Sequence, residues 1–106
     1  MRTIWKYKLP DVGTGQFVLD MPKGSHVLRV AVQYGHPCIW VLVDSSQPTV
    51  PRRFAIVGTG HPAPSADEAF WLGSFHLFGD NFVGHLFTDW ENSHVPDIPI
   101  VEGETP

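Results

Sequence analysis

Apolar and aromatic residues recur in short runs along the chain, and clusters of Gly, Pro, Asp and Ser separate these runs. The seven runs occupy residues 2–9, 16–21, 26–34, 38–43, 52–57, 69–78 and 80–90. Short runs rich in β-branched and aromatic residues, with turn residues between them, are typical of antiparallel sandwiches and barrels. The pattern predicts an all-β fold, an antiparallel sandwich or flattened barrel of about seven strands.

Alternation of apolar and polar residues predicts which strands have one solvent-facing side. In 2–9, three apolar side chains share a face opposite Arg2, Lys6 and Lys8, namely Trp5, Tyr7 and Leu9. In 26–34, four share a face opposite Arg29 and Gln33, namely Leu28, Val30, Val32 and Tyr34. Because successive side chains of a strand point to opposite faces, both segments are predicted to be half-buried strands.

The run CIWVLV at 38–43 differs because it is apolar at every position. Such a run requires both of its faces to be covered. We therefore expect a central strand, or a strand with one face in a subunit interface. Since this run and AFWLGSFHLF hold more apolar surface than one small core consumes, we also expect a homo-oligomer, most simply a symmetric dimer.

Three further segments carry local signals. Ser65-Ala66-Asp67-Glu68 has the form of a capping box and predicts one short helical turn near 65–69. Gly79-Asp80-Asn81 is expected to close a hairpin between the last two runs. Residues 1–90 are predicted to form a single β domain, whereas 91–106 form an acidic, Pro-containing tail that is flexible or bound to a partner.

Charge and composition limit the classes of partner. The net charge of the 106-residue chain is −4, and residues 91–106 supply four acidic residues and no basic one. The remaining charges balance, so the electrostatic attraction that dominates affinity for duplex DNA is absent, and we expect no duplex DNA as a partner. No apolar stretch has the ~18 residues that cross a bilayer, so no membrane association is expected. A single cysteine and the lack of a secretion signal favour a reducing cytoplasm.

Catalytic and metal-binding patterns are not found in the sequence. No two of the six histidines have the i, i+4 spacing of metal ligands, although His76 and His85 are expected to face each other across the last hairpin. Cys38 lies in the apolar run and is expected to behave as a small hydrophobic residue. No serine occupies a nucleophile elbow. We expect a non-enzymatic protein with no catalytic residue, metal or cofactor.

The stretch PRRFAIVGTGHPAP at 51–64 permits two interpretations. In the first, Gly58-Thr59-Gly60 is a strand end whose glycines adopt positive φ or form a bulge. In the second, the amides of 58–60 surround an anion together with Arg52 or Arg53, and His61 adds a donor. The spacing matches neither a P-loop nor a dinucleotide fingerprint. Both interpretations remain open.

Most of the tryptophans are expected in the core, but a sandwich this small has room for only some of its aromatic side chains. Exposed aromatic residues mark an interface or a platform on which a nucleotide base stacks. Trp71 and Trp40 are the candidates for such a platform.

Four blocks in fixed order, MRTIWKY, PCIWVLVD, RRFAIVGTGHP and LGSFHLFGDNFVGHLF, resemble a family of short uncharacterised proteins encoded by bacteriophages and prophages. The resemblance covers about residues 1–90. It implies the cytoplasm of an infected or lysogenic bacterium as the location, and it implies no activity.

These observations lead to three hypotheses. The first is a non-catalytic counter-defence protein that sequesters a small phosphorylated, nucleotide-derived signal, bound by Arg52, Arg53, Gly58, Thr59, Gly60, His61, Trp71 and Trp40. The second is a phage inhibitor that docks on a host protein through exposed aromatic residues and the acidic tail. The third is a structural accessory protein without a ligand.

Overall fold

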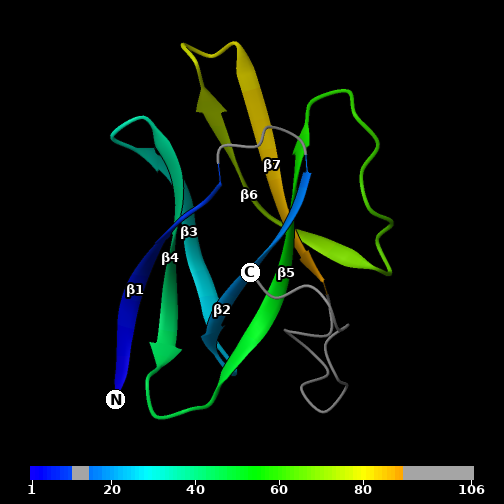
Figure 1. Ribbon diagram of the computed structural model, residues 1–106. Coiled ribbons are helices and arrows are strands. Elements are labelled where there is room, and N and C mark those ends of the chain that lie inside the picture. Colours follow the sequence, from blue (N-terminus) through cyan, green and yellow to red (C-terminus); the bar gives the residue numbers. More distant parts are fainter. Residues whose placement is uncertain (11–14, 90–106) are drawn as a thin grey trace.

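A computed structural model describes residues 1–10 and 15–89, which form seven antiparallel strands in two sheets (Figure 1). The strands are β1 (Arg2–Lys8), β2 (Gly15–Pro22), β3 (His26–Gln33), β4 (His36–Asp44), β5 (Thr49–Gly58), β6 (Ala69–Leu77) and β7 (Phe82–Asp89). The predicted all-β class is confirmed. The two sheets stay separate, so the fold is a sandwich and not a closed barrel.

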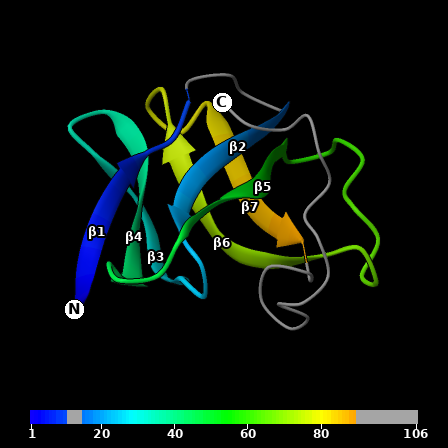
Figure 2. The same cartoon turned by 60° about the horizontal axis from the view of Figure 1, so that its bottom comes forward.

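The strand order is β1-β4-β3 in the three-stranded sheet and β2-β5-β7-β6 in the four-stranded sheet, and Figure 2 shows the two groups of strands side by side. Strand β4 pairs with β1 on one side and β3 on the other, so the fully apolar run is a central strand, as predicted. Strand β3 also packs closely against β6. The two sheets therefore approach each other most closely along these two strands.

The core lies between the inner faces of the two sheets. Its buried side chains come from both sheets and from the segment after β1, and they are Leu9, Met21, Ile39, Val41, Val43, Phe54, Ile56, Phe75, Leu77 and Leu86. Strand β4 contributes alternate residues to this core because its other side chains point to the opposite face. Phe17 stacks on Phe54 with ring centroids 5.6 Å apart. Burial of these aliphatic and aromatic side chains is the main stabilising contribution.

The face predicted for β3 holds for Val30 and Val32 but is wrong for Leu28, because the strand contains a β-bulge. The register with β4 shifts between Val27 and Arg29, so the alternation changes at Leu28. Val27 and Val30 pack against the core, whereas Leu28 is 49% exposed. Tyr34 lies beyond the strand in the turn to β4, with φ 51° and 88% of its surface exposed. A period-2 pattern cannot show where one extra residue interrupts it.

A second β-bulge lies in β6, where the register with β7 shifts between Trp71 and Gly73. Gly73 is needed here because a Cβ atom at this position would lie 3.0 Å from both Cβ and Cγ2 of Val30 on β3. The missing side chain thus permits the close packing of β3 against β6. Trp71, before the bulge, remains 58% exposed.

The segment predicted as a helical turn near 65–69 forms a hydrogen-bonded turn, and no helix is found within 1–10 and 15–89. The amides of Glu68 and Ala69 both donate to the carbonyl of Ser65, and the Ser65 hydroxyl donates to Glu68. One of the two capping-box contacts forms, from the Ser65 amide to Glu68 Oε1 at 3.4 Å, but β6 begins at Ala69 and ends the turn. The described residues accordingly hold no helix that is long and apolar enough to cross a membrane. The tail predicted at 91–106 lies outside the described residues.

Candidate functional site

Arg52 and Arg53 point to opposite sides of β5, as adjacent residues of a strand must. Arg52 is buried with 4% exposure, and its Nη1 donates to the carbonyl of Ser25 at 2.8 Å while Nε donates to Thr88 Oγ1 at 3.2 Å. Its guanidinium lies 5.6 Å from the ring centroid of Phe54. Burial lowers the pKa of Arg52 to about 10, and the nearby Asp89 carboxylate opposes this shift. Arg52 thus links β5 to the turn before β3 and to β7.

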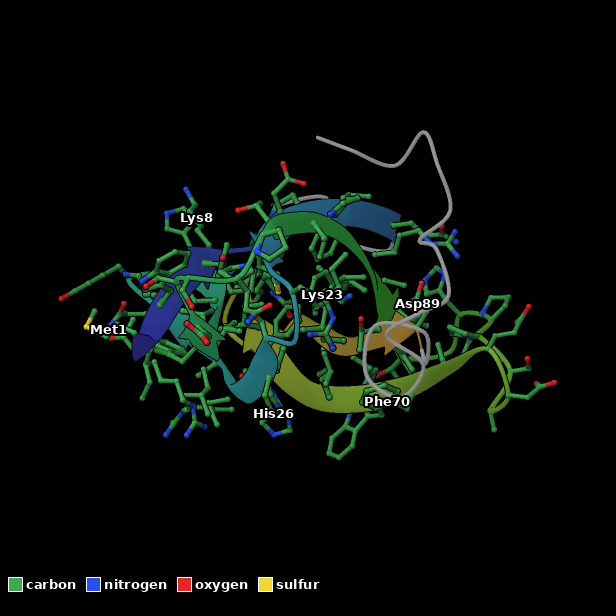
Figure 3. The ribbon with its side chains drawn as sticks, turned by 90° about the horizontal axis from the view of Figure 1, so that it is seen from below. Met1, Lys8, Lys23, His26, Phe70 and Asp89 are labelled. Carbon is green, nitrogen blue, oxygen red and sulfur yellow. The ribbon has the colours of Figure 1, made fainter. Side chains whose placement is uncertain are left out.

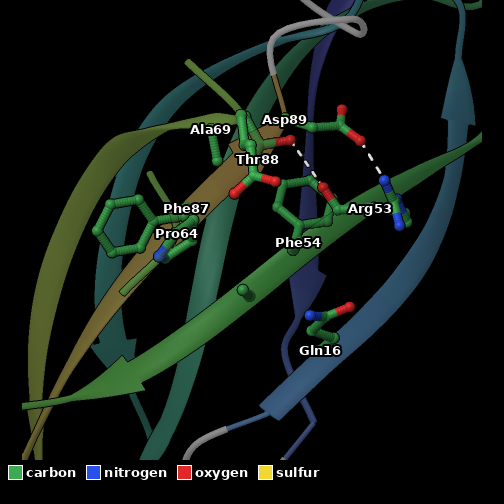
Figure 4. A pocket seen from close by; sticks show the side chains of 10 residues that line it. Gln16, Arg53, Phe54, Pro64, Ala69, Phe87, Thr88 and Asp89 are labelled. Atoms are coloured by element: carbon green, nitrogen blue, oxygen red, sulfur yellow. Dashed lines mark hydrogen bonds and ion pairs between the residues drawn. The ribbon is translucent and has the colours of Figure 1, made fainter. Parts of the chain in front are cut away.

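Arg53 lies on the outer face of the four-stranded sheet. Its Nε is 3.3 Å from Asp89 Oδ2, and the two side chains are 32% and 15% exposed. Both line a pocket of about 190 Å³ whose apolar surface includes Ala55 and Phe87, while Glu68 reaches it from the loop between β5 and β6 (Figure 4). Two carboxylates and one arginine give this pocket a net negative lining. The pocket is therefore a poor site for a phosphate.

The Gly58-Thr59-Gly60 segment is a strand end followed by a turn. Gly60 has φ 92°, which a side chain would disfavour. The Thr59 amide donates to the Val83 carbonyl, and the His61 amide donates to the Gly58 carbonyl. These amides hold the turn in place and do not converge on a common point. His61 is exposed. The geometry corresponds to the first interpretation of this stretch, and Arg52 and Arg53 do not meet around an anion here.

Hydrogen bonds link Trp71 to Thr59, both predicted site residues, through Ser74 and His85. Neither Ser74 nor His85 was predicted from the sequence to belong to the ligand site. Trp71 Nε1 donates to Ser74 Oγ at 3.1 Å, Ser74 Oγ lies 2.7 Å from His85 Nδ1, and His85 Nε2 lies 2.8 Å from Thr59 Oγ1. The expected pairing of His76 with His85 is wrong, since His85 is opposite Ser74. His76 instead lies 3.2 Å from Asp80.

Trp40 lies on the other side of the molecule, on the outer face of the three-stranded sheet. Its neighbours Ile39 and Val41 are fully buried in the core, so the Trp40 side chain points outward and is half-buried. In the register of the sheet, Lys6 is directly opposite Trp40 on β1, and Arg29 is directly opposite it on β3. Directly opposed residues share a face. A cationic residue therefore flanks Trp40 on each side.

The outer face of the three-stranded sheet gathers four of the seven basic residues of the chain, at Arg2, Lys6, Lys8 and Arg29. Lys6 Nζ donates to Gln33 Oε1 at 2.8 Å. Since Cys38 lies between their register positions on β4, this bond passes over Cys38, which is only 3% exposed. Within residues 1–10 and 15–89, the side chains of Arg29 and Lys8 make no hydrogen bond or ion pair.

A shallow hollow completes this face, which we call the basic face. It is lined by Arg29, Ala31, Val32, Gln33 and Trp40. The described acidic residue on the same face is Asp44, at the end of β4, where it contacts the N-terminal ammonium group at 3.3 Å. Alternation in 2–9 already placed the three basic residues of β1 together. The pairing of β1 and β3 with β4, which brings them beside Trp40, could not be read from the sequence.

The structure therefore separates the predicted site residues into four places. Arg52 is in the interior and Arg53 lines the acidic pocket, whereas Thr59 and Trp71 belong to the outer hydrogen-bonded group and Trp40 is on the basic face. Among the residues that the structure describes, no group of three or more His, Cys, Asp or Glu side chains is placed to hold a metal ion. Within the same described ranges, the basic face places cations with unpaired side chains beside the aromatic ring of Trp40.

Comparison with protein-family models matches residues 1–96 to a domain of unknown function, DUF7352. No curated protein and no solved structure matches the chain.

Proposed function

The chain belongs to the DUF7352 family, whose function is unknown, and we propose that its basic face is a non-catalytic binding site for a small phosphorylated, nucleotide-type ligand. The proposal keeps the ligand class expected from the sequence and moves the site from Arg52, Arg53 and the Gly58–Gly60 turn to Trp40. The observation that carries it is the register of the three-stranded sheet, which sets Lys6 and Arg29 on either side of Trp40.

Each part of such a ligand has a matching group on this face. The half-buried indole of Trp40 offers a flat surface for a base, and stacking of a base on an aromatic side chain contributes about 1–3 kcal/mol. The side chains of Arg29 and Lys8, which have no hydrogen-bond or ion-pair partner among residues 1–10 and 15–89, supply cationic donors for phosphate oxygens. Lys6 is held by Gln33 and keeps two of its three donors. The ligand thus meets an aromatic surface with positive charge on both sides.

The distribution of charge supports this face over the opposite one. The outer face of the four-stranded sheet carries Asp20, Glu68 and Asp89, and its arginine, Arg53, is paired with Asp89. Figure 3 shows Lys8 on β1 and Asp89 at the other end of the molecule. Although the net charge of the chain is −4, the basic face of its described part is positive and attracts an anion to the place where Trp40 lies.

Titration calorimetry of the full chain against cyclic dinucleotides and ADP-ribose derivatives tests the proposal. We expect heat from at least one ligand, and an affinity that falls as salt concentration rises. Trp40→Leu should weaken binding by about 10-fold or more through loss of stacking. Arg29→Ala combined with Lys8→Ala should weaken it by a similar factor.

A matched control removes two positive charges elsewhere. Lys23→Ala combined with Arg53→Ala changes the net charge by the same amount but leaves the basic face intact, so binding should be retained. An equal loss in both double variants would mean that only general attraction acts. Absence of heat with every ligand would contradict the proposal and leave a structural role as the better account.

A second candidate function, docking on a protein, is favoured by two exposed aromatic residues at hairpin turns. Tyr34, between β3 and β4, is 88% exposed, and Phe78, between β6 and β7, is 69% exposed. Both have positive φ, 51° and 54°, which bulky residues rarely adopt. The two turns lie at the same end of the sandwich (Figures 1 and 2). Aromatic residues kept in strained, exposed positions are typical of contact sites.

The second candidate is tested with Tyr34→Asn combined with Phe78→Asn, which fits the same backbone but removes the aromatic groups. Affinity purification of host proteins with the natural chain and with this variant should recover a partner only with the natural chain. Recovery of the same proteins with both would contradict docking through these turns.

The biological setting follows from the resemblance to phage and prophage proteins and stays a proposal. A counter-defence protein of this kind would act in the host cytoplasm by sequestering a nucleotide signal. Its expression should restore phage growth on bacteria that use such a signal, whereas Trp40→Leu should not restore it. If the natural chain and Trp40→Leu restore phage growth equally, any counter-defence effect does not depend on the basic face.

A further inference from the structure

The hydrogen-bonded chain on the outer face of the four-stranded sheet, from Trp71 through Ser74 and His85 to Thr59, is independent of the basic face. Indole N–H can only donate, so Ser74 Oγ accepts the bond from Trp71 at 3.1 Å. The hydroxyl proton of Ser74 is then free to point at His85 Nδ1, 2.7 Å away. A neutral imidazole that accepts at Nδ1 carries its proton on Nε2, which donates to Thr59 Oγ1 at 2.8 Å. Because each hydroxyl can accept as well as donate, the contacts allow both tautomers of His85, and this one lets Nδ1 take the proton of Ser74.

This arrangement has the parts of an activated nucleophile. A hydroxyl lies within hydrogen-bond reach of an imidazole base, and a third group orients that base, which is the general geometry of nucleophilic catalysis by serine. The Trp71 donor also favours negative charge that develops on Ser74 Oγ during attack. Ser74 is exposed, so a small substrate can reach its oxygen from solvent.

The β6 bulge creates this contact. In a regular strand, residues 71 and 74 would point to opposite faces, because their separation is odd. The register shift between Trp71 and Gly73 brings both side chains to the outer face, Trp71 opposite Phe87 and Ser74 opposite His85. Bulges frequently re-aim a side chain in this way beside an active site.

We propose that Ser74 is a nucleophile for activated carboxylic esters and thioesters, with His85 as its general base and Thr59 as a positioning residue. Ser74 Oγ forms a bond to the carbonyl carbon, the bond from that carbon to the leaving alcohol or thiol breaks, and the hydroxyl proton passes to His85 Nδ1. His85 then returns this proton to the leaving group or to water. The product is an O-acyl serine, which water can hydrolyse to regenerate the hydroxyl.

The test uses p-nitrophenyl acetate and peptide mass spectrometry of the full chain. Ser74 should gain one acetyl group faster than Ser46, an exposed serine whose hydroxyl donates to Asp44 Oδ1 at 2.6 Å and has no imidazole partner. His85→Asn places an amide near the position of Nδ1 but cannot take a proton. It should slow acetylation of Ser74 by about 100-fold, the lower range for loss of a general base.

Thr59→Val keeps the shape of residue 59 and removes the acceptor for Nε2–H, so it should slow acetylation by a smaller factor than His85→Asn. Both variants should leave acetylation of Ser46 unchanged, which controls for general effects on reactivity and folding. The proposal is overturned if Ser74 reacts no faster than Ser46, or if His85→Asn acetylates Ser74 at the rate of the natural chain.

Discussion

Gly84, in the middle of the four-stranded sheet, leaves space that the ring of Phe75 occupies. The two residues are directly opposite each other on β7 and β6. A Cβ atom on Gly84 would lie 2.5 Å from Cζ and 2.9 Å from Cε2 of Phe75, and 2.9 Å from Cε2 of Phe82. Phe75 is 3% exposed and belongs to the core, so its ring has little room to retreat. Gly84→Ala should therefore overpack the core.

The size of the effect follows from two opposing contributions. Overpacking a dense core costs about 1–3 kcal/mol. Replacing glycine by alanine at an ordinary φ returns about 0.4–1 kcal/mol by restricting the unfolded chain. The net loss of unfolding free energy should be about 1–2 kcal/mol, which lowers the melting temperature of a domain of this size by about 4–16 °C.

Urea denaturation of a double-mutant cycle measures this interaction. Phe75→Leu removes the ring atoms that a methyl group at position 84 would strike, so the double variant should be more stable than the sum of the single effects by about 1 kcal/mol. Additive effects, or a Gly84→Ala protein as stable as the natural chain, would refute the packing explanation for this glycine.

Four further predictions concern single side chains and assembly. Tyr34→Asn should raise the unfolding free energy by up to about 1 kcal/mol in urea denaturation, because Asn adopts positive φ more readily than Tyr. Arg52→Ala should lower the unfolding free energy by about 2–4 kcal/mol in the same assay. Arg53→Ala, which removes a partly exposed ion pair, should lower it by under about 1 kcal/mol. Hydrogen bonds from the hydroxyl and then the amide of Ser46 lower the pKa of Asp44 from 3.8 to about 2. The contribution of Asp44 to stability is therefore complete above pH 3.8 and is lost as the pH falls toward 2. Asp44→Asn should make the unfolding free energy depend less on pH in this range. Light scattering over a range of concentrations should give the mass of a dimer, and the mass of one chain throughout would exclude it.

The period-2 pattern was sufficient to predict the all-β class, because side-chain alternation directly reflects burial on one face of a strand. The unbroken apolar run placed β4 in the centre of a sheet, because both of its faces must be covered. The period-2 pattern failed for Leu28 in β3, where the bulge shifts the alternation without changing the composition of the strand. The turn near 65–69 forms as a single turn closed by the bond from the Ala69 amide to the Ser65 carbonyl, and pairing of β6 with β7 decides where it ends.

Prediction of the site was limited by pairing between distant strands. Arg52 and Arg53 were predicted to bind an anion together because they are adjacent in sequence. In the structure Arg52 is buried and Arg53 forms an ion pair with Asp89. Arg29 and Lys6 were unremarkable alone and become neighbours of Trp40 only through the β1-β4-β3 order. Ser74 and His85 carry no motif, since a hairpin register and a bulge bring them together.

The position of β7 has a consequence for synthesis of the chain. It is the last of the seven strands in sequence, yet it lies inside the four-stranded sheet, between β5 and β6. As a nascent chain emerges from the ribosome, β1, β4 and β3 can pair early, but β6 has no sheet partner until β7 follows it. The four-stranded sheet therefore stays incomplete until β7, the last described strand, is made, and part of the apolar inner surface of the three-stranded sheet stays uncovered until then. Partial chains should be recognised by chaperones and proteases, and folding should be a late, single event rather than a strand-by-strand process.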